Sequence, residues 1–405
     1  MQIAMLAVGD ELVDGRFVDT NSQTLARSLA RIGHTLREIR VVRDEPGAMR
    51  LALDDLGARH EHLFVSGGLG ITRDDLTRAV VADWLGEGLV EDSIGVEAIK
   101  TKLEERGGRF TEELRGHALR PGSSTGIPNF TGLALGFSAH HAVLAVTVHV
   151  LPGVPHELVP MCDWVVGRLQ TGMRRQRLLR VQDLTERDVE QRLRTVTIPA
   201  EVTLGLVALS GPIELSLTRY DGDEAGLDAL AEEVSALFEA HLVGVDTTLE
   251  RRIAQQLTQR GETLATAESC TGGLLASLIT DVPGSSVFFL EGVVSYANAS
   301  KIARLGVAAE TLERFGAVSP QTVGEMAQGV RLALGADWSV ATSGIAGPTG
   351  GTASKPVGRV YFAVAGPSGT THDERTWAGR TREVVKRHAA AHALLLLSRA
   401  IAAAE

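Results

Sequence analysis

The chain has 405 residues, of which 44% are hydrophobic and 22% are charged, and its formal net charge at pH 7 is −10. This balance is typical of a folded globular protein and excludes extensive disorder. The negative charge argues against a protein that binds nucleic acid over a broad surface, because phosphate contacts need clustered lysine and arginine. A local basic pocket for one nucleotide is compatible with it. The length is sufficient for two or three domains.

The cysteines and the apolar segments narrow the class of protein further. Cys162 and Cys270 are too few for a disulfide framework or a cysteine zinc site within one chain. Residues 1–8 lack the basic start of a signal peptide. Residues 389–404 are apolar but contain a histidine and an arginine, and they fall short of the roughly 20 residues that span a membrane. We therefore expect a packed terminal helix in a cytoplasmic protein without membrane contact.

Strand-like and helix-like segments alternate over the first 85 residues. The pattern predicts strands at 3–8, 37–42 and 62–66 and helices at 20–32, 46–56 and 78–85. Such alternation is typical of a parallel α/β sheet, in which ligands bind at the carboxyl ends of the strands. The loops 9–11 and 67–75 follow two of these strands and are rich in glycine and acidic residues. We expect the ligand site of this segment there.

Two uses of these loops remain open from the residues alone. Glycines beside helix starts can bind phosphate, and the carboxylates of Asp10, Glu11, Asp74 and Asp75 can hold a hard cation such as Mg²⁺. Alternatively, the carboxylates cap the following helices, which is the more common use of acidic residues at such positions.

A serine turn near residue 269 is the main candidate for chemistry. A short strand at 263–265 and a helix at 274–279 are expected around it, so Ser269 would lie at a strand end. Glycines allow a ligand close to the backbone, and free N–H groups at a helix start can hold an anion. The alternative is a capping serine followed by packing glycines. Cys270 is a rival nucleophile, although burial as a small residue is favoured.

Two downstream segments add to this candidate site. Residues 295–301 contain Tyr296 and Lys301, and a lysine whose pKa is lowered can serve as general base to a serine. Most lysines beside a tyrosine are instead solvated surface residues. The glycine-rich loop 343–351, followed by 355–358, suits backbone wrapping of a phosphate or sugar. Its alternative is a long flexible turn.

Four motifs together resemble one known family. AESCTGG (267–273), SYANASK (295–301), SGIAGPTGG (343–351) and KPVG (355–358) resemble the C-terminal domain of the CinA family, the nicotinamide mononucleotide deamidases. The resemblance covers residues 246–405 and implies a serine amidohydrolase with a Ser/Lys dyad and no cofactor. It implies Ser269 as nucleophile and Lys301 as general base, assisted by Ser286 and Tyr296. The residues expected to bind the substrate and its phosphate are Thr271, Gly272, Gly273, Gly344, Gly347, Gly350 and Arg380.

Residues 1–167 resemble the N-terminal domain of the same family, which is similar to the MoaB/MogA molybdopterin-binding fold. The matching motifs lie at 9–21, 67–77 and 151–157. The resemblance implies an ADP-ribose pyrophosphatase that uses a divalent metal such as Mg²⁺. The implied nucleotide and metal residues are Glu11, Gly67, Gly68, Gly70, Asp74, Asp75 and Thr77.

This N-terminal segment departs from the family pattern in two places. Ile71 stands where the family usually has proline, and residues 128–137 read PNFTGLALGF where the family is nearer to PNPxGTAPGF. Two loop prolines are replaced and bulky residues enter a loop that normally lines the site. The departures predict an altered or lost N-terminal activity.

Residues 168–245 correspond to the KH-like middle domain of the family. Strands at 202–209 and 213–219 and a helix at 225–242 predict a small α+β unit. Four arginines at 174–180 precede an acidic segment at 183–190, which favours a self-paired or solvated face. The G-x-x-G loop with which true KH modules clamp nucleic acid is absent between Gly172 and Gly244. A spacer or dimerisation unit is therefore expected.

The full expectation is an α/β protein of three parts, which deamidates nicotinamide mononucleotide in its C-terminal domain. The parts are a parallel-sheet domain (1–167), an α+β middle domain (168–245) and an α/β deamidase domain (246–405). The resemblance also implies a homodimer. Two alternatives remain: a metal-dependent ADP-ribose pyrophosphatase only, or a non-catalytic, competence-related scaffold that binds nucleotides. His388 and His392, one helical turn apart, are expected to be core or surface residues rather than metal ligands.

Overall fold

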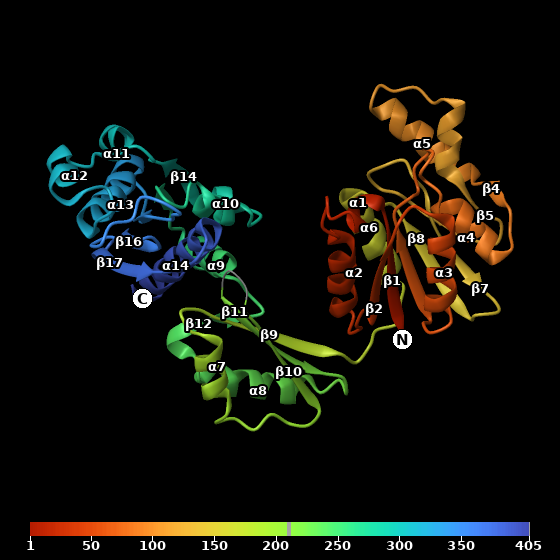
Figure 1. Cartoon of the computed structure of the whole chain (residues 1–405), viewed down its shortest axis with the longest axis horizontal. Coiled ribbons are helices and arrows are strands. Elements are labelled where there is room, and N and C mark those ends of the chain that lie inside the picture. The colour runs from red at the N-terminus through yellow and green to blue at the C-terminus, as the bar shows by residue number, and fades with distance from the viewer. Residues whose placement is uncertain (209–211, 405) are drawn as a thin grey trace. The chain divides into compact units, whose positions relative to one another are not determined.

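The structure is a computed structural model of the chain and describes residues 1–208 and 212–404. The chain divides into two compact units, which are described separately below. Unit 1 holds residues 1–175 together with 220–222, and unit 2 holds residues 176–219 and the chain from 223 onward. Figure 1 follows the chain through its helices and strands.

A six-stranded sheet forms the centre of unit 1, with the strand order β2-β1-β3-β8-β7-β6. The first four strands in this order are parallel, whereas β7 and β6 run antiparallel to their neighbours. These strands are β1 (Ile3–Val8), β2 (Glu38–Val42), β3 (His62–Ser66), β6 (Thr125–Ile127), β7 (Gly136–His141) and β8 (Val146–Leu151). The predicted parallel sheet is confirmed, and the predicted bounds in this segment agree with the structure to within one residue.

Helices cover both faces of this sheet, so all side chains of β1 are buried. Leu6 packs in one core cluster with Met49 of α3, and its neighbour Met5 packs in another with Leu25 of α2. Alternate residues of a strand point to opposite faces, so a strand that is covered on both sides has to be apolar throughout. The remaining elements of unit 1 are α1 (Asp10–Val13), α2 (Thr20–Arg31), α3 (Pro46–Gly57), α4 (Thr77–Leu85), β4 (Leu89–Glu91), α5 (Ser93–Glu105), η1 (Glu112–Ala118), β5 (Leu119–Pro121) and α6 (Pro155–Val166).

The first part of unit 2 is a four-stranded sheet with the order β10-β11-β9-β12 and two helices. Its elements are β9 (Arg175–Val181), α7 (Glu186–Leu193), β10 (Val202–Ala208), β11 (Ile213–Arg219), α8 (Glu224–Ala236), η2 (Glu239–His241) and β12 (Leu242–Val245). The expected helix 225–242 is wrong at its end, because Leu242 begins a strand that pairs with Val181 of β9. Leu209, the expected end of β10, lies outside the described residues.

Two arginines of the run, both on β9, are paired within the chain, as the charge pattern predicted. Arg177 contacts Glu224 and Asp228 at 2.9 and 2.6 Å, and Arg180 contacts Glu214 at 2.6 Å. These side chains therefore have partners in the fold.

A five-stranded sheet with the order β14-β13-β15-β16-β17 forms the second part of unit 2. The strands β14, β13 and β15 are parallel, and β16 and β17 are antiparallel to their neighbours. The strands are β13 (Leu264–Glu268), β14 (Phe289–Val294), β15 (Trp338–Gly344), β16 (Arg359–Gly366) and β17 (Gly369–Thr376). The helices are α9 (Leu249–Arg260), α10 (Leu274–Thr280), η3 (Ser285–Val287), α11 (Asn298–Leu305), α12 (Ala309–Phe315), α13 (Pro320–Leu334) and α14 (Arg382–Ala403).

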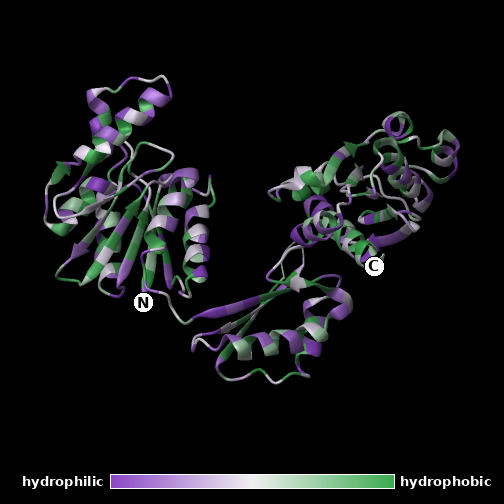
Figure 2. Ribbon diagram, turned by 180° about the vertical axis from the view of Figure 1, so that it is seen from behind, coloured by the Kyte–Doolittle hydropathy of each residue, from purple (hydrophilic) through white to green (hydrophobic). Residues whose placement is uncertain are grey.

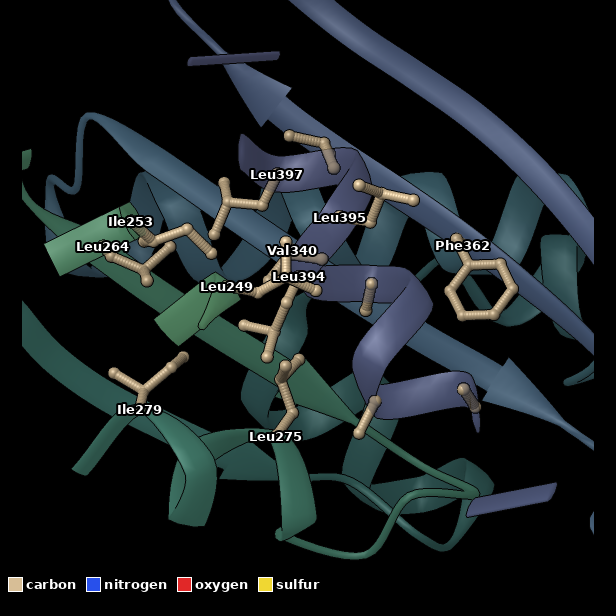
Figure 3. Packing of buried hydrophobic residues seen from close by; sticks show 14 of the residues in the cluster. Leu249, Ile253, Leu264, Leu275, Ile279, Val340, Phe362, Leu394, Leu395 and Leu397 are labelled. Carbon is tan, nitrogen blue, oxygen red and sulfur yellow. The ribbon is translucent and has the colours of Figure 1, made fainter. Parts of the chain in front are cut away.

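One face of this sheet packs against α9, α10 and α14. Figure 3 shows Leu394 of α14 among side chains from these elements, together with Leu249 and Leu264, and all three are buried. The opposite face packs against α13 through residues such as Met326. The predicted packed terminal helix is confirmed, since ten residues of α14 are buried. No helix within residues 1–208 and 212–404 is long and apolar enough to cross a membrane. Figure 2 shows helices that carry both hydrophobic and hydrophilic residues, as helices that cover a sheet with one face do.

Candidate functional site

Ser269 lies at the carboxyl end of a fully buried strand. Strand β13 is buried at each of its five residues, and Ser269 follows its last residue, Glu268. The Ser269 N–H donates to the carbonyl oxygen of Thr342 on β15 at 3.0 Å. The hydroxyls of Thr271 and Thr342 are 2.8 Å apart in the interior. The neighbouring strand thus fixes the turn, and the expected position of Ser269 at a strand end is confirmed.

Parallel pairing brings Lys301 to this serine. Glu268 pairs with Val294 at the end of β14, and the Ser295 N–H donates to the Glu268 carbonyl at 2.8 Å. The chain then enters α11, whose fourth residue is Lys301. The amine nitrogen of Lys301 lies 3.1 Å from the Ser269 hydroxyl oxygen. The pairing of β13 with β14 therefore brings together two residues that are 32 positions apart in the sequence.

Lys301 is a buried lysine and not a surface one. Its side chain has no exposed area, and its nitrogen donates to the carbonyl oxygens of Ser295 at 2.6 Å and Tyr296 at 3.4 Å. Burial lowers the pKa of Lys301, because a charged ammonium loses its hydration in the interior. An amine with two N–H bonds to carbonyls has its lone pair left for Ser269. This arrangement suits a general base.

The helix start after Ser269 is occupied by the protein itself. The carboxylate of Glu268 accepts hydrogen bonds from the N–H groups of Gly273, Leu275 and Ala276 at 2.9, 3.1 and 2.9 Å. The expectation that this helix start holds an external anion is therefore wrong, because a buried carboxylate already takes its donors. The Gly272 N–H donates to the Ser269 carbonyl at 3.2 Å.

Two backbone donors remain in the turn. In the part of the chain that the structure describes, no other residue accepts a hydrogen bond from the N–H group of Cys270 or Thr271, and the Cys270 N–H contacts its own thiol. Of the expected donors Thr271, Gly272 and Gly273, the last two already donate, to the Ser269 carbonyl and to the Glu268 carboxylate. The sequence does not predict which of these N–H groups are already used, because that depends on the direction of the Glu268 side chain.

Cys270 is not a competitor of the serine. Its side chain is buried in the core cluster of unit 2, as expected. Burial raises the pKa of the Cys270 thiol to about 12, so the thiol stays protonated at neutral pH.

The structure brings Arg382 to the site, whereas the sequence selected Arg380. Arg382 donates to the Tyr296 hydroxyl at 2.8 Å and to the Gly347 carbonyl at 3.0 Å. Arg380 is exposed, and its backbone N–H donates to the Trp377 carbonyl at 3.4 Å. The helix begins at Arg382 after the capping residue Thr381. A threonine cap at 381 followed by Glu383 in the first turn is a helix-start pattern that could have located this arginine.

Lys386 is a second cation that the sequence missed. It lies on α14 four residues after Arg382 and thus on the same face of the helix. Its nitrogen is 3.4 Å from the point where a Cβ atom on Gly272 would lie. Within the described residues, Lys386 has no hydrogen-bond or ion-pair partner. The turn after Ser269 is thus flanked by an unpaired positive charge.

The glycine-rich loop 343–358 is anchored and is not a flexible turn. The Lys355 ammonium donates to the Phe315 carbonyl at 2.6 Å, and the Ser343 hydroxyl donates to the Ala317 carbonyl at 2.6 Å. A Cβ atom on Gly344 would lie 2.6 Å from the Arg359 carbonyl oxygen, so glycine is needed there. Gly347 presents its carbonyl to Arg382, and Gly350 follows in the same loop. Ser286 is exposed on η3, and no hydrogen bond joins it to the dyad in the described structure.

Unit 1 contains a separate cavity of about 950 Å³ at the carboxyl ends of its parallel strands. Six of the residues that the sequence proposed for this unit line it: Glu11, Gly67, Gly68, Gly70, Asp74 and Asp75. Thr77, the seventh, is buried beside Gly68. The cavity lies where a parallel sheet places its ligand.

Asp75 closes the glycine-rich loop and does not cap a helix. Its carboxylate accepts from the N–H groups of Gly70 at 2.8 Å and Thr72 at 2.9 Å. The N-cap of α4 is Leu76, without a side-chain hydrogen bond. The capping alternative is therefore wrong for Asp75, because its carboxylate folds back over the preceding residues.

The same cavity concentrates negative charge. Burial raises the pKa of Asp44, and repulsion from Asp10, Glu11 and Asp74 adds to this effect. A cation would relieve the repulsion. Within residues 1–208 and 212–404, however, no three histidine, cysteine or acidic side chains are grouped for metal binding. Within the described residues, the protein alone therefore offers no complete set of metal ligands in this cavity.

Side chains brace the loop that lost its prolines. The Asn129 amide donates to Glu157 at 2.6 Å and to the Ala134 carbonyl at 3.0 Å, and its oxygen accepts from the Gly132 N–H at 2.7 Å. Lys102 donates to the carbonyl of Gly132 at 2.9 Å. The loop therefore keeps a defined shape and lines the cavity with residues 131–134.

His392 is a core histidine and His388 is half-buried, in line with the expectation that they are core or surface residues. The His392 ring is fully buried, and its nitrogens lie 3.1 Å from an Asp183 oxygen and 2.7 Å from an Asp373 oxygen. His388 stacks on Trp377 with 5.7 Å between ring centres. Two carboxylates account for both nitrogens of His392, so neither nitrogen is available to a metal.

Comparisons with known proteins find matches for both the N-terminal and the C-terminal part of the chain. Residues 246–401 match the family model "CinA C-terminal domain", and residues 4–171 match "Probable molybdopterin binding domain". A CinA-like protein of Syntrophotalea carbinolica is 36% identical over 98% of each chain. A CinA-like protein of Anaeromyxobacter dehalogenans is 38% identical over 99% of this chain and 100% of its own.

A solved structure is also similar to part of the chain. The competence/damage inducible protein CihA from Agrobacterium tumefaciens is 42% identical over 38% of this chain and 93% of its own, with a TM-score of 0.37. The full-length similarity to CinA-like proteins, together with the two domain matches, shows that this chain belongs to the CinA family.

Proposed function

We propose that unit 2 is a nicotinamide mononucleotide deamidase, which hydrolyses the carboxamide to nicotinate mononucleotide and ammonia. The observation that carries this proposal is the buried Lys301 amine 3.1 Å from the Ser269 hydroxyl. Burying a lysine against a serine is costly and unnecessary for packing, whereas it produces the neutral base that a serine nucleophile needs.

The reaction follows from the positions of these groups. The Lys301 amine takes the hydroxyl proton of Ser269 while the serine oxygen attacks the carboxamide carbon. The N–H groups of Cys270 and Thr271 donate to the oxyanion that forms. Lys301 then gives its proton to the amide nitrogen, and ammonia leaves. A water molecule, deprotonated by Lys301, hydrolyses the acyl-enzyme and restores Ser269.

The substrate phosphate is assigned to the cations of α14. Arg382 joins Tyr296 and the loop 343–351, and Lys386 reaches the turn after Ser269. Guanidinium and ammonium groups are the usual phosphate ligands in proteins. The role that the family resemblance suggested for Arg380 is thus proposed for Arg382.

Ammonia release from nicotinamide mononucleotide by the purified protein, with and without EDTA, tests this function. We expect EDTA-resistant release that is lost in Ser269→Ala and in Lys301→Ala, while both variants stay folded by circular dichroism. Lys100→Ala, which removes an exposed lysine of unit 1, is the matched control and should keep full activity. Full activity in either dyad variant would refute the mechanism.

A second activity is proposed for the cavity of unit 1. Its size, its glycine-rich loop and its acidic residues suit a nucleotide diphosphate such as ADP-ribose with a divalent metal. Glu11 and Asp74 would hold the metal, which neutralises charge on the phosphates when bound. Cleavage of ADP-ribose that EDTA abolishes would support this activity. Absence of both reactions would favour a nucleotide-binding scaffold.

A further inference from the structure

Glu268 is buried, and its side-chain oxygens accept hydrogen bonds from backbone N–H groups. Its side chain has no exposed area, and within the described residues it forms no ion pair. One carboxylate oxygen accepts from Gly273 and Leu275, and the other accepts from Ala276. Burying a polar group is costly unless hydrogen bonds compensate it, so three N–H donors make the burial tolerable.

These bonds divide the backbone donors of the serine turn into two sets. The N–H groups of Gly273, Leu275 and Ala276 donate to Glu268, whereas those of Cys270 and Thr271 have no acceptor in another described residue. Helix α10 has glycine at its N-cap and no side-chain cap of its own. Glu268, which precedes the serine in the chain, therefore ties the start of the helix back to the end of β13.

We propose that Glu268 is a positioning residue, which holds the Ser269 oxygen and the Cys270 and Thr271 donors in the geometry that the reaction needs. The inference deepens the proposed amide hydrolysis and rests on it. The carboxylate fixes both ends of a five-residue turn, Ser269–Gly273, because it belongs to the residue before the turn and binds the residues at and after its end. Glu268 also occupies the start of α10, which directs the substrate phosphate to Arg382 and Lys386.

The isosteric substitution Glu268→Gln separates this role from packing. A glutamine has the same shape, but its NH₂ group cannot accept a hydrogen bond, so at least one of the three N–H groups loses its partner. A misplacement of about 1 Å can reduce a rate by about 100-fold. We expect kcat to fall about 10- to 100-fold, with KM for nicotinamide mononucleotide changed less than about twofold. The pH at which activity is half-maximal should not move, because Lys301 keeps its contacts.

The experiment measures ammonia release and, separately, the rate at which phenylmethanesulfonyl fluoride modifies Ser269. In that reaction the serine oxygen bonds to sulfur, fluoride leaves and the hydroxyl proton is lost, so it reports on the nucleophile without the natural substrate. We expect both rates to fall in Glu268→Gln. If Glu268→Gln does not fold, Glu268→Asp, whose shorter side chain cannot reach all three N–H groups, replaces it. Ser269→Ala lacks the hydroxyl, so the modification that disappears in this variant is the one on Ser269.

Asp223→Asn is the matched control, since Asp223 caps helix α8 of the middle sheet by accepting from the Gly226 N–H at 2.9 Å. This variant should lower the melting temperature without changing either rate. Wild-type rates in Glu268→Gln, or a wild-type Ser269 that resists the reagent, would overturn the proposal. A third outcome separates the two claims. If the reagent labels the wild type but not Glu268→Gln, and the wild type releases no ammonia, the deamidase function is refuted and the positioning role is upheld.

Discussion

Replacing Lys301 by methionine should abolish catalysis and change how stability depends on pH. Methionine is unbranched, apolar and close to lysine in length, so it can fill a site with no exposed area. The substitution removes the N–H bonds to the carbonyls of Ser295 and Tyr296, each worth about 1 kcal/mol. It also removes the cost of burying an amine. The two effects oppose each other, so we expect a net change within about 2 kcal/mol at pH 7.

The pH dependence isolates the lysine. Burial lowers the pKa of Lys301 in the folded protein, whereas an unfolded lysine has a pKa of about 10.4. Between these two values the unfolded chain binds a proton that the folded chain does not, so raising the pH favours folding. The gain approaches about 1.4 kcal/mol per pH unit in this window. Below the folded pKa the full cost of burial is present and constant.

The assay is urea unfolding, followed by tryptophan fluorescence, of wild type and Lys301→Met between pH 6 and 10. As the pH rises, the unfolding free energy of the wild type should increase relative to that of Lys301→Met, because the two proteins share all other titrating groups. Lys100→Met controls for the loss of a lysine as such. A difference that stays constant over this range would refute the claim that Lys301 is buried with a lowered pKa.

Three further predictions follow from the same structure. Arg382→Ala should raise KM for nicotinamide mononucleotide at least about tenfold, because a charge-assisted bond to the phosphate is worth about 1.5–3 kcal/mol; Arg380→Ala should change it little, and steady-state kinetics of both variants decides between them. Deamidase activity should rise with pH to a plateau, with a midpoint below the ordinary pKa of lysine, because only the neutral amine of Lys301 accepts the serine proton; a midpoint at or above that value would contradict the mechanism. Leu394→Ala should destabilise unit 2 by about 2–5 kcal/mol, since this fully buried side chain packs in the core between α14 and the sheet; a denaturation midpoint equal to wild type would show that the site is not well packed.

The spacing of apolar residues predicts an element well where the segment has one apolar face or is apolar on all sides. Residues 3–8 and 63–65 are apolar because their strands are covered on both sides, and the sequence predicts the bounds 3–8 and 62–66 correctly. The pattern failed after Ala236, where apolar residues continued in a helical rhythm although the chain turns into β12. Pairing with β9 decides that segment, and pairing is not visible in the spacing of one strand.

The sequence by itself determined that a serine stands between a buried strand and a helix, that a lysine follows the next strand, and that Cys270 is buried. These features depend on the composition of short segments. The tertiary structure alone decided that Lys301 is desolvated against Ser269, because that contact depends on the register between β13 and β14. It also decided that Glu268 takes the helix donors, that Asp75 folds back over its own loop, and that Arg382 rather than Arg380 reaches Tyr296. Each of these depends on the direction in which a side chain leaves its element. A displacement of a few ångströms changes which partner a side chain reaches, and the spacing of residues along the chain does not predict such a displacement.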